Sequence, residues 1–191
     1  MNKSKHYFAL VFLALAITAC DGKKHDGGKD APSDDLKVVI IRHGEKPKDG
    51  DNLSCQGQNR ALKLPAVLVQ KIGTPDYVYV PALENDKSTA HSRMFQTASP
   101  LAIKYNLSIN SKYSAKDDAA IAKSVFKKNG TVLMVWEHSA IPALASALAV
   151  SGAPTWEDAD FDSIWMISYK AGKAKLALDN EGIKPSPVCN F

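Results

Sequence analysis

Short β-rich runs alternate with amphipathic helical patterns along most of the chain, and this alternation restricts the fold more than any other feature of the sequence. Strands separated by helices favour a mostly parallel sheet, because each helix carries the chain back across a face of the sheet. The sequence therefore predicts an α/β fold, a three-layer sandwich with a mostly parallel central sheet and helices on both faces. The expected strands are Lys37–Arg42, Tyr77–Val80, Leu107–Ser111, Thr131–Trp136, Ser163–Tyr169 and Lys173–Leu178.

Four helical patterns lie between the expected strands, at Gln56–Lys71, Thr89–Tyr105, Asp117–Lys128 and Ile141–Ala149. Ser54 is expected to cap the first helix, because its hydroxyl can accept a hydrogen bond from an unpaired backbone N–H. Pro100 is expected to kink the second helix or divide it in two. The tight-turn sequence KAGK joins the last two strands, which predicts an antiparallel hairpin at one edge of the sheet.

The first 19 residues have the pattern of a secretory signal peptide. Lys3 and Lys5 precede the apolar run Phe8–Ile17, which is too short to span a bilayer as a stable helix. The end of this segment, ITAC, resembles the lipobox of bacterial lipoproteins, which implies that Cys20 is lipidated. The alternative is a plain secretory signal with a chance cysteine. We expect a lipid-anchored protein on the periplasmic side of the bacterial cell envelope, and Asp21 slightly favours the inner membrane.

Residues 20–36 are polar and Gly-rich, which indicates a flexible tether between the lipid and one folded domain, residues 37–191. The formal charge is +4, and the signal peptide holds two lysines and no acid, so the charge without it is +2. This is too close to neutral to predict a nucleic-acid partner. Export to an oxidising compartment would allow Cys55 and Cys189 to pair, but the sequence leaves a disulfide and two free thiols equally open.

Two of the expected strands end directly at a histidine, His43 in KVVIIRH and His138 in TVLMVWEH. In sheets of this kind the ligand site lies beyond the carboxyl ends of the strands. Each of these histidines also has charged neighbours, so the pair indicates a functional site. His91, the remaining histidine of the domain, is expected to be structural or exposed, and contact with the rim of the pocket is the alternative.

Four segments carry a resemblance to a known family. RHGEKP after a hydrophobic strand resembles the RHG signature of the histidine phosphatase (phosphoglycerate mutase-like) superfamily. LSCQGQNRA, SRMFQTASPLA and VLMVWEHSAIPALASAL are similar to that family's later segments, in the same order. Together they cover most of residues 37–150. The WEH variant and the lipoprotein-like start of the chain suggest an exported bacterial lipoprotein branch of this superfamily.

The resemblance implies a role for each residue of the site. His43 is the nucleophile and forms a phosphohistidine, and His138 stabilises the charge that develops on a transferring oxygen. Arg42 and Arg93 offer planar N–H donors to the phosphoryl oxygens. Gly44 lets the backbone approach the phosphate. No cofactor is implied, and the histidines lack the spacing of a metal site.

The resemblance does not supply a general acid. The stretch in which phosphoglycerate mutases carry a Glu is NSKYSAKDDAA here, and its two acids, Asp117 and Asp118, look like residues that begin a helix. Ser139 stands where the acid-phosphatase branch has an Asp. The remaining candidates are Glu45 and Glu137, and for each of them an ordinary structural role is the alternative. Arg60 is expected on a solvated helix face rather than in contact with phosphate.

Two functions remain open at this point. The first is a metal-independent phosphatase that hydrolyses a phosphomonoester or a phosphohistidine through a phosphohistidine intermediate. Its partners would be a phosphorylated small molecule or a phosphoprotein, and the membrane through the lipid anchor. The second is a catalytically weak lipoprotein on the same fold that binds phosphate or another polyanion. The intact set of arginines and histidines favours the enzyme, and the missing general acid favours the binder.

Overall fold

The computed structural model describes residues 31–83, 91–189 and 191. The predicted signal peptide, Cys20, Asp21 and most of the expected tether lie outside the described residues, as does the start of the helix expected from Thr89. Among the described residues, no helix is both long enough and apolar enough to cross a membrane.

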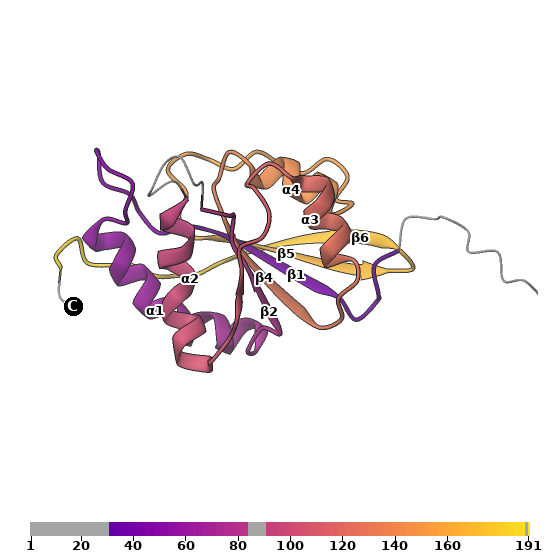
Figure 1. Cartoon of the computed structure of the whole chain (residues 1–191), viewed down its shortest axis with the longest axis horizontal. Helices are drawn as coiled ribbons and strands as arrows, with labels where there is room; N and C mark the ends of the chain where they lie inside the picture. The colour runs from indigo at the N-terminus through magenta and orange to yellow at the C-terminus, as the bar shows by residue number, and fades with distance from the viewer. Residues whose placement is uncertain (1–30, 84–90, 190) are drawn as a thin grey trace, which may run out of the picture.

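Six strands form one sheet in the order β3-β2-β4-β1-β5-β6 (Figure 1). The first four strands in the chain are parallel to one another, while β5 pairs antiparallel with both β1 and β6. The predicted α/β fold with a mostly parallel sheet and an antiparallel edge hairpin is therefore confirmed. The strands are β1 (Lys37–Arg42), β2 (Tyr77–Tyr79), β3 (Ile109–Asn110), β4 (Thr131–Trp136), β5 (Ser163–Lys170) and β6 (Lys173–Asn180).

The helices cover both faces of the sheet, and Figure 1 shows α1 beside α2 and α3 beside α4. Alternate residues of β1 point to opposite faces: Val38 and Ile40 pack with α3 and α4, while Val39 and Ile41 pack with α1 and α2. β1 is thus buried on both faces, which explains its unbroken apolar run. The helices are α1 (Cys55–Ile72), α2 (Ser92–Tyr105), α3 (Asp118–Val125) and α4 (Ile141–Ala147).

Two local predictions about the helices have different outcomes. Ser54 caps α1 as predicted, and its hydroxyl accepts a hydrogen bond from the Gly57 N–H at 3.1 Å.

Pro100, however, does not divide α2, which continues to Tyr105. A proline inside a helix costs about 3 kcal/mol. Met94 and Leu101 are both buried against the sheet on either side of it, and each buried side chain of this size contributes about 1.5–3 kcal/mol. Packing on both sides therefore offsets the lost hydrogen bond.

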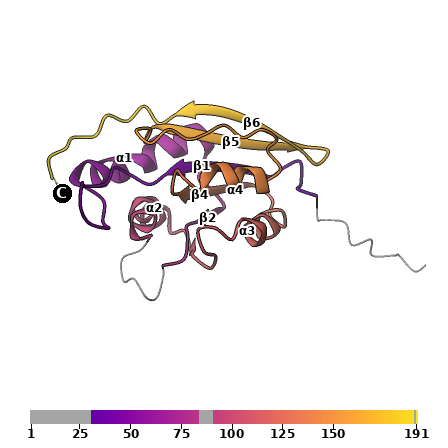
Figure 2. The same cartoon turned by 90° about the horizontal axis from the view of Figure 1, so that it is seen from above.

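The segment that follows β6 runs back along α1, as Figure 2 shows. Cys55, the first residue of α1, forms a disulfide with Cys189. This is one of the two states that the sequence left open. The Asn59 amide also donates hydrogen bonds to the carbonyls of Ser186 and Val188, at 2.9 and 2.7 Å. The C-terminal segment is therefore held against the start of α1.

The chain enters the domain at the opposite end of the sheet. Asp34 accepts a hydrogen bond from the Ala171 N–H at 2.8 Å and pairs with Lys170 Nζ at 2.8 Å. Lys170 is the last residue of β5 and Ala171 lies in the turn to β6, next to the amino end of β1. Figure 1 shows this turn at one end of the molecule and the loop that follows β1 at the other.

The loop after β1 packs against the first turn of α1 at two glycines. A Cβ added to Gly44 would lie 2.7 Å from the Gly57 carbonyl oxygen, and a Cβ added to Gly57 would overlap the Glu45 carbonyl oxygen. That carbonyl also accepts hydrogen bonds from the N–H and the hydroxyl of Ser54, at 2.9 and 3.0 Å. The close backbone contact fixes the loop relative to α1, and it requires glycine at both positions.

We expect the Gly57→Ala variant to be less stable than the wild type. Alanine favours a helix interior by about 1 kcal/mol over glycine, but here its Cβ would push into the Glu45 backbone, and overpacking costs about 1–3 kcal/mol. The free energy of unfolding, measured with urea, should fall by roughly 1–2 kcal/mol. Gln58→Ala, on the neighbouring half-buried residue, is the matched control and should change it by less than about 0.5 kcal/mol. A Gly57→Ala variant as stable as the wild type would contradict the contact.

Candidate active site

His43 follows β1 directly, and its side chain is buried. Its Nδ1 lies 2.7 Å from the Gly44 carbonyl oxygen. A carbonyl can only accept, so Nδ1 carries the proton and the neutral ring keeps a free lone pair on Nε2. Burial, together with the smaller effects of the charges of Arg42, Arg93 and His138, lowers the pKa of His43 to about 4, and the hydrogen bond to the Gly44 carbonyl opposes this fall. The imidazole is therefore neutral at neutral pH, as a nucleophile must be.

Arg42 is also buried, and a loop before β5 engages its guanidinium. We call residues 157–162, of sequence EDADFD, the acidic loop. Arg42 Nη1 donates to the carbonyls of Asp158 and Asp160 at 2.6 and 2.9 Å, and the guanidinium lies 3.8 Å from the centre of the Phe161 ring. The Nε of Arg42 is buried with no hydrogen-bond partner among the described residues. Burial lowers the pKa of Arg42 to about 10, so the side chain keeps its charge at neutral pH.

Helix α2 holds the loops of the site in place from its first two turns. Arg93 donates from Nη2 to the Gly50 carbonyl at 2.8 Å and from Nε to the Asn52 carbonyl at 3.3 Å. The buried Thr97 hydroxyl accepts from the Gly44 N–H at 2.9 Å and donates to the Arg93 carbonyl at 2.7 Å. Arg93 and Thr97 therefore tie α2 to the loop that begins at His43.

His138 lies just beyond β4, the parallel neighbour of β1. Its Nε2 is 2.8 Å from Asp158 Oδ1, and its Nδ1 is buried without a hydrogen-bond partner in the described part of the chain. A carboxylate only accepts, so Nε2 carries a proton. The donor that the resemblance assigns to a phosphoryl oxygen is thus bound to a carboxylate of the acidic loop.

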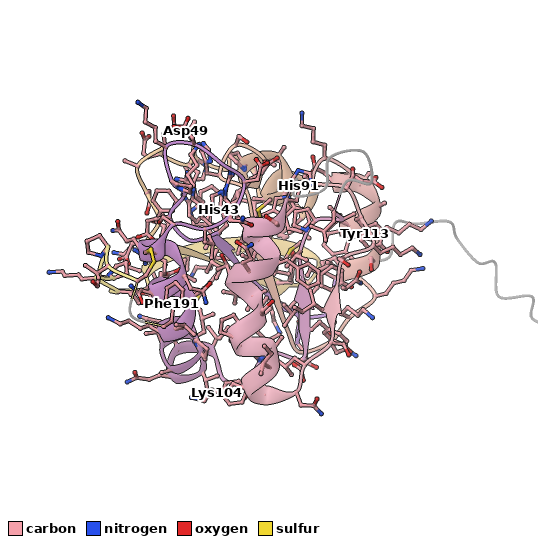
Figure 3. All side chains as sticks on the ribbon, turned by 60° about the vertical axis from the view of Figure 1, so that its left-hand side comes forward. His43, Asp49, His91, Lys104, Tyr113 and Phe191 are labelled. Atoms are coloured by element: carbon pink, nitrogen blue, oxygen red, sulfur yellow. A yellow bond between two sulfur atoms is a disulfide. The ribbon has the colours of Figure 1, made fainter. Side chains whose placement is uncertain are left out.

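The structure brings four of the predicted residues together at the carboxyl ends of β1 and β4. Arg42, Arg93 and His138 all lie close enough to His43 to lower its pKa. Figure 3 shows His43, Asp49 and His91 at one end of the molecule and Lys104, from the far end of α2, at the other. His91 Nδ1 donates to the Ala82 carbonyl at 3.0 Å, in keeping with the structural role expected for it.

Glu45 and Arg60 form a buried ion pair, and the prediction that Arg60 lies on a solvated face is wrong. Arg60 is 4% exposed. It donates from Nε to both carboxylate oxygens of Glu45, at 3.1 and 3.0 Å, and from Nη2 to Oε1 at 2.8 Å. Its Nη1 contacts Glu181 at 2.5 Å and Asp162 at 3.2 Å. The acids come from distant parts of the chain, so helical periodicity around Arg60 could not reveal them.

Glu181 is the most deeply buried acid of this cluster. Burial raises its pKa to about 8; Arg60 opposes the rise, and the charges of Asp162 and Glu45 add to it. One guanidinium faces three carboxyl groups, so a proton on Glu181 at neutral pH removes an excess negative charge from the interior. Glu45 keeps its ion pair with Arg60, which occupies both of its oxygens.

The other acids considered from the sequence lie at the starts of helices. Glu137 is half-buried just after β4, and its main-chain carbonyl accepts hydrogen bonds from the N–H groups of Ala140 and Ile141, where α4 begins. Asp117 is the N-cap of α3 and Asp118 its first residue, as the sequence predicts. None of these contacts indicates that Glu137, Asp117 or Asp118 transfers a proton.

Sequence reasoning missed three residues of the site: Thr97, Asp158 and Phe161. Thr97 lies inside the QTA segment, so its position in the resemblance was available as a signal. Asp158 and Phe161 belong to the acidic loop, which has no helical or strand periodicity and no counterpart among the four family-like segments. The acidic loop reaches Arg42 because it leads into β5, which pairs with β1, and this pairing is a property of the folded chain.

One hollow of the described surface lies outside this site. A hollow of about 530 Å³ lies between α1 and α2, lined by residues that include Leu62, Pro65 and Ile103, and no arginine or histidine of the site lines it.

Within residues 31–83, 91–189 and 191, no group of three or more His, Cys, Asp or Glu side chains is arranged to hold a metal ion.

Comparisons with known proteins identify the fold. No protein-family model and no curated protein matches the chain. Among solved structures, the protein histidine phosphatase SixA in complex with tungstate matches with a TM-score of 0.54 and 14% identity, over 76% of this chain and 97% of that one. The alpha-ribazole phosphatase from Shigella flexneri matches with a TM-score of 0.52 and 15% identity, over 78% of this chain and 99% of that one.

The chain thus has an α/β phosphatase fold. More narrowly, the structures that it resembles are members of the histidine phosphatase (phosphoglycerate mutase-like) superfamily, and the chain shares their fold. The resemblance carried by the four sequence segments is therefore confirmed at the level of the fold.

We expect His43 to titrate far below an ordinary histidine. NMR of the imidazole Cε1–H over pH 3.5–8 should give a pKa of about 4 for His43, because burial and nearby positive charge disfavour its protonated form. The signal is assigned by its absence in His43→Gln. A His43 that titrates near 6.5 would show that the ring is solvated.

We also expect Glu181 to make stability fall as pH rises. Its folded-state pKa of about 8 exceeds the ordinary value of 4.5, so between these pH values the folded chain binds the proton and the unfolded chain does not. The free energy of unfolding must then fall with rising pH. Urea unfolding at pH 6.5 and 8 should show a loss of up to about 2 kcal/mol. In Glu181→Gln this loss should disappear, and an equal loss in both proteins would refute the assignment.

Proposed function

We propose that this chain is a metal-independent phosphatase in which His43 takes the phosphoryl group and water then removes it. Its substrates are phosphomonoesters or phosphohistidine, on a small molecule or a protein. The observation that carries the proposal is the state of His43: buried, neutral, with Nδ1–H bound to the Gly44 carbonyl and Nε2 free, among Arg42, Arg93 and His138.

The surrounding charges suit this chemistry. A phosphoryl group gathers negative charge on its oxygens during transfer, and preorganised donors stabilise that charge most in a site that excludes water. The unpartnered Nε of Arg42 and the Nε2–H of His138 are two such donors. The Gly44 carbonyl holds the ring of His43 in one orientation, and it would stabilise the positive charge that the ring gains when Nε2 bonds to phosphorus.

The names of the similar structures support the reaction class. One is a protein histidine phosphatase and the other an alpha-ribazole phosphatase, so both are phosphatases. A phosphohistidine leaves as a nitrogen group and needs little help from an acid, whereas an ester oxygen leaves poorly without a proton.

We further propose that the protein is exported and anchored by a lipid on Cys20, at the periplasmic side of the cell envelope, with the inner membrane favoured by Asp21. The disulfide between Cys55 and Cys189 supports export, because disulfides persist in oxidising compartments.

A phosphate-binding lipoprotein without turnover is the second candidate, and one observation favours it. Arg42 Nη1 and His138 Nε2 are bound to oxygens of the acidic loop. If these contacts persist with phosphate present, the donors would hold an anion weakly and stabilise no transition state.

The decisive experiment traps the intermediate. The full chain, purified in detergent with EDTA present, is mixed with p-nitrophenyl phosphate and quenched in alkali, in which phosphohistidine is stable. Peptide mass spectrometry should find one phosphate on His43, and His43→Ala should lose both this phosphate and all turnover.

His91→Asn is the matched control. It removes a histidine outside the site, and asparagine tolerates the left-handed backbone at that position, where φ is 59°. It should retain the phosphorylated His43 and the turnover. Wild-type protein that binds phosphate but neither turns over nor becomes labelled would leave the binding function as the better account.

A further inference from the structure

The acidic loop is fixed by its backbone, through contacts with buried side chains. The Trp156 indole N–H donates to the Asp160 carbonyl at 2.9 Å, and Trp156 is itself buried against Trp165. Arg42 Nη1 donates to the carbonyls of Asp158 and Asp160. Asp160 Oδ1 accepts from the N–H groups of residues 162 and 163, at 2.8 and 3.0 Å. The course of the loop therefore does not depend on the side chain of Asp158.

The Asp158 side chain occupies an unusual position on this loop. Its carboxylate lies 2.8 Å from His138 Nε2 and is otherwise open to solvent, with the side chain 94% exposed. A polar contact so exposed contributes little to stability. The anchored backbone nevertheless brings the carboxylate to the one ring nitrogen that, in the proposed function, faces the transferring phosphoryl group. Asp158 thus lies within one hydrogen bond of a group that would touch the substrate.

We propose that Asp158 is the acid–base residue of the reaction, which protonates the leaving oxygen and later accepts a proton from the attacking water. This inference rests on the proposed function and names its proton donor. Of the two acids expected from the sequence, Glu45 has both oxygens bound to Arg60, and Glu137 lies where α4 starts. Asp158 instead combines contact with the site and access to solvent protons.

The steps balance with Asp158 in this role. A phosphate monoester monoanion brings one proton, which passes to the Asp158 carboxylate so that two negative groups do not face each other. His43 Nε2 then bonds to phosphorus, the bond from phosphorus to the leaving oxygen breaks, and that oxygen takes the proton from Asp158. In the second step water attacks phosphorus and gives a proton to the Asp158 carboxylate, and the bond between phosphorus and Nε2 breaks. Asp158 then returns this proton to the phosphate, which leaves as the monoanion, so Asp158 is a carboxylate and His43 is neutral again.

The dependence of the rate on the leaving group tests this role. The full chain in detergent is assayed for kcat/KM on p-nitrophenyl phosphate, which has a good leaving group, and on phenyl phosphate and glycerol phosphate, which have poor ones. Asp158→Asn should lose roughly 100-fold or more on the two poor leaving groups and less than about 5-fold on p-nitrophenyl phosphate. The substitution is isosteric at an exposed side chain, so the fold should be unaffected.

Two further variants separate this role from loss of charge. Glu157→Gln removes a neighbouring exposed acid from the same loop and should leave all three rates unchanged. Asp158→Glu keeps the carboxyl group and should recover part of the activity on the poor leaving groups.

Three outcomes would overturn the inference. The first is an equal loss, or none, on all three substrates in Asp158→Asn. The second is wild-type protein that hydrolyses p-nitrophenyl phosphate but neither of the poor substrates, since such an enzyme uses no acid. The third is tighter binding of inorganic phosphate by Asp158→Asn with an unchanged preference among substrates, which would make Asp158 a competitor for the anion. Wild-type protein without turnover of any substrate would instead refute the proposed function itself.

Discussion

One buried guanidinium holds together the end of the molecule that carries the candidate site. Arg60 projects from α1 and binds Glu45 from the loop after β1, Asp162 from the end of the acidic loop and Glu181 from the segment after β6. Removing one partner of a buried ion pair costs about 3–5 kcal/mol, because a charge is left without compensation. Arg60 therefore fixes the loop after β1, the acidic loop and the C-terminal segment relative to one another, and the disulfide and the contact between Gly44 and Gly57 reinforce this arrangement.

The donor groups of the site are buried or half-buried, and each of them needs acceptors in the folded protein. Arg42 is buried beside the neutral ring of His43. Buried polar donors need acceptors, and the acidic loop supplies two carbonyl oxygens to Arg42 and a carboxylate oxygen to His138. These acidic-loop oxygens lie where the N–H groups of Arg42 and His138 point. A phosphoryl group that enters must bind to the donors that the loop leaves unused, such as the Nε of Arg42, or displace the Asp158 side chain from His138.

Local patterns in the sequence were enough to predict most of the sheet. The bounds of β1 and β4 agree with the predictions, because both strands are continuous apolar runs that end at a charged residue. The cap at Ser54 and the hairpin between β5 and β6 followed from side-chain and turn chemistry. The meeting of His43 and His138 followed from the rule that parallel strands end at one edge of the sheet.

The expectation that Arg60 is solvated failed because it depends on contacts across long distances in the chain. Two of its three acidic partners, Asp162 and Glu181, lie more than a hundred positions away. The division of α2, one of the two outcomes expected at Pro100, does not occur because both halves of the helix pack on the sheet. The acidic loop has no periodicity, so nothing in EDADFD indicates that its backbone would bind Arg42. Repeating patterns predict elements, but they do not predict which loop will close over a site.

The start of the described chain and the candidate site lie at opposite ends of the sheet. The described chain starts beside the turn between β5 and β6, whereas His43 and His138 lie where β1 and β4 finish. An anchor joined to the described chain at its first residue would therefore attach to the domain at the pole opposite His43. In the proposed lipid-anchored arrangement, the candidate site would lie on the side of the domain away from its point of attachment.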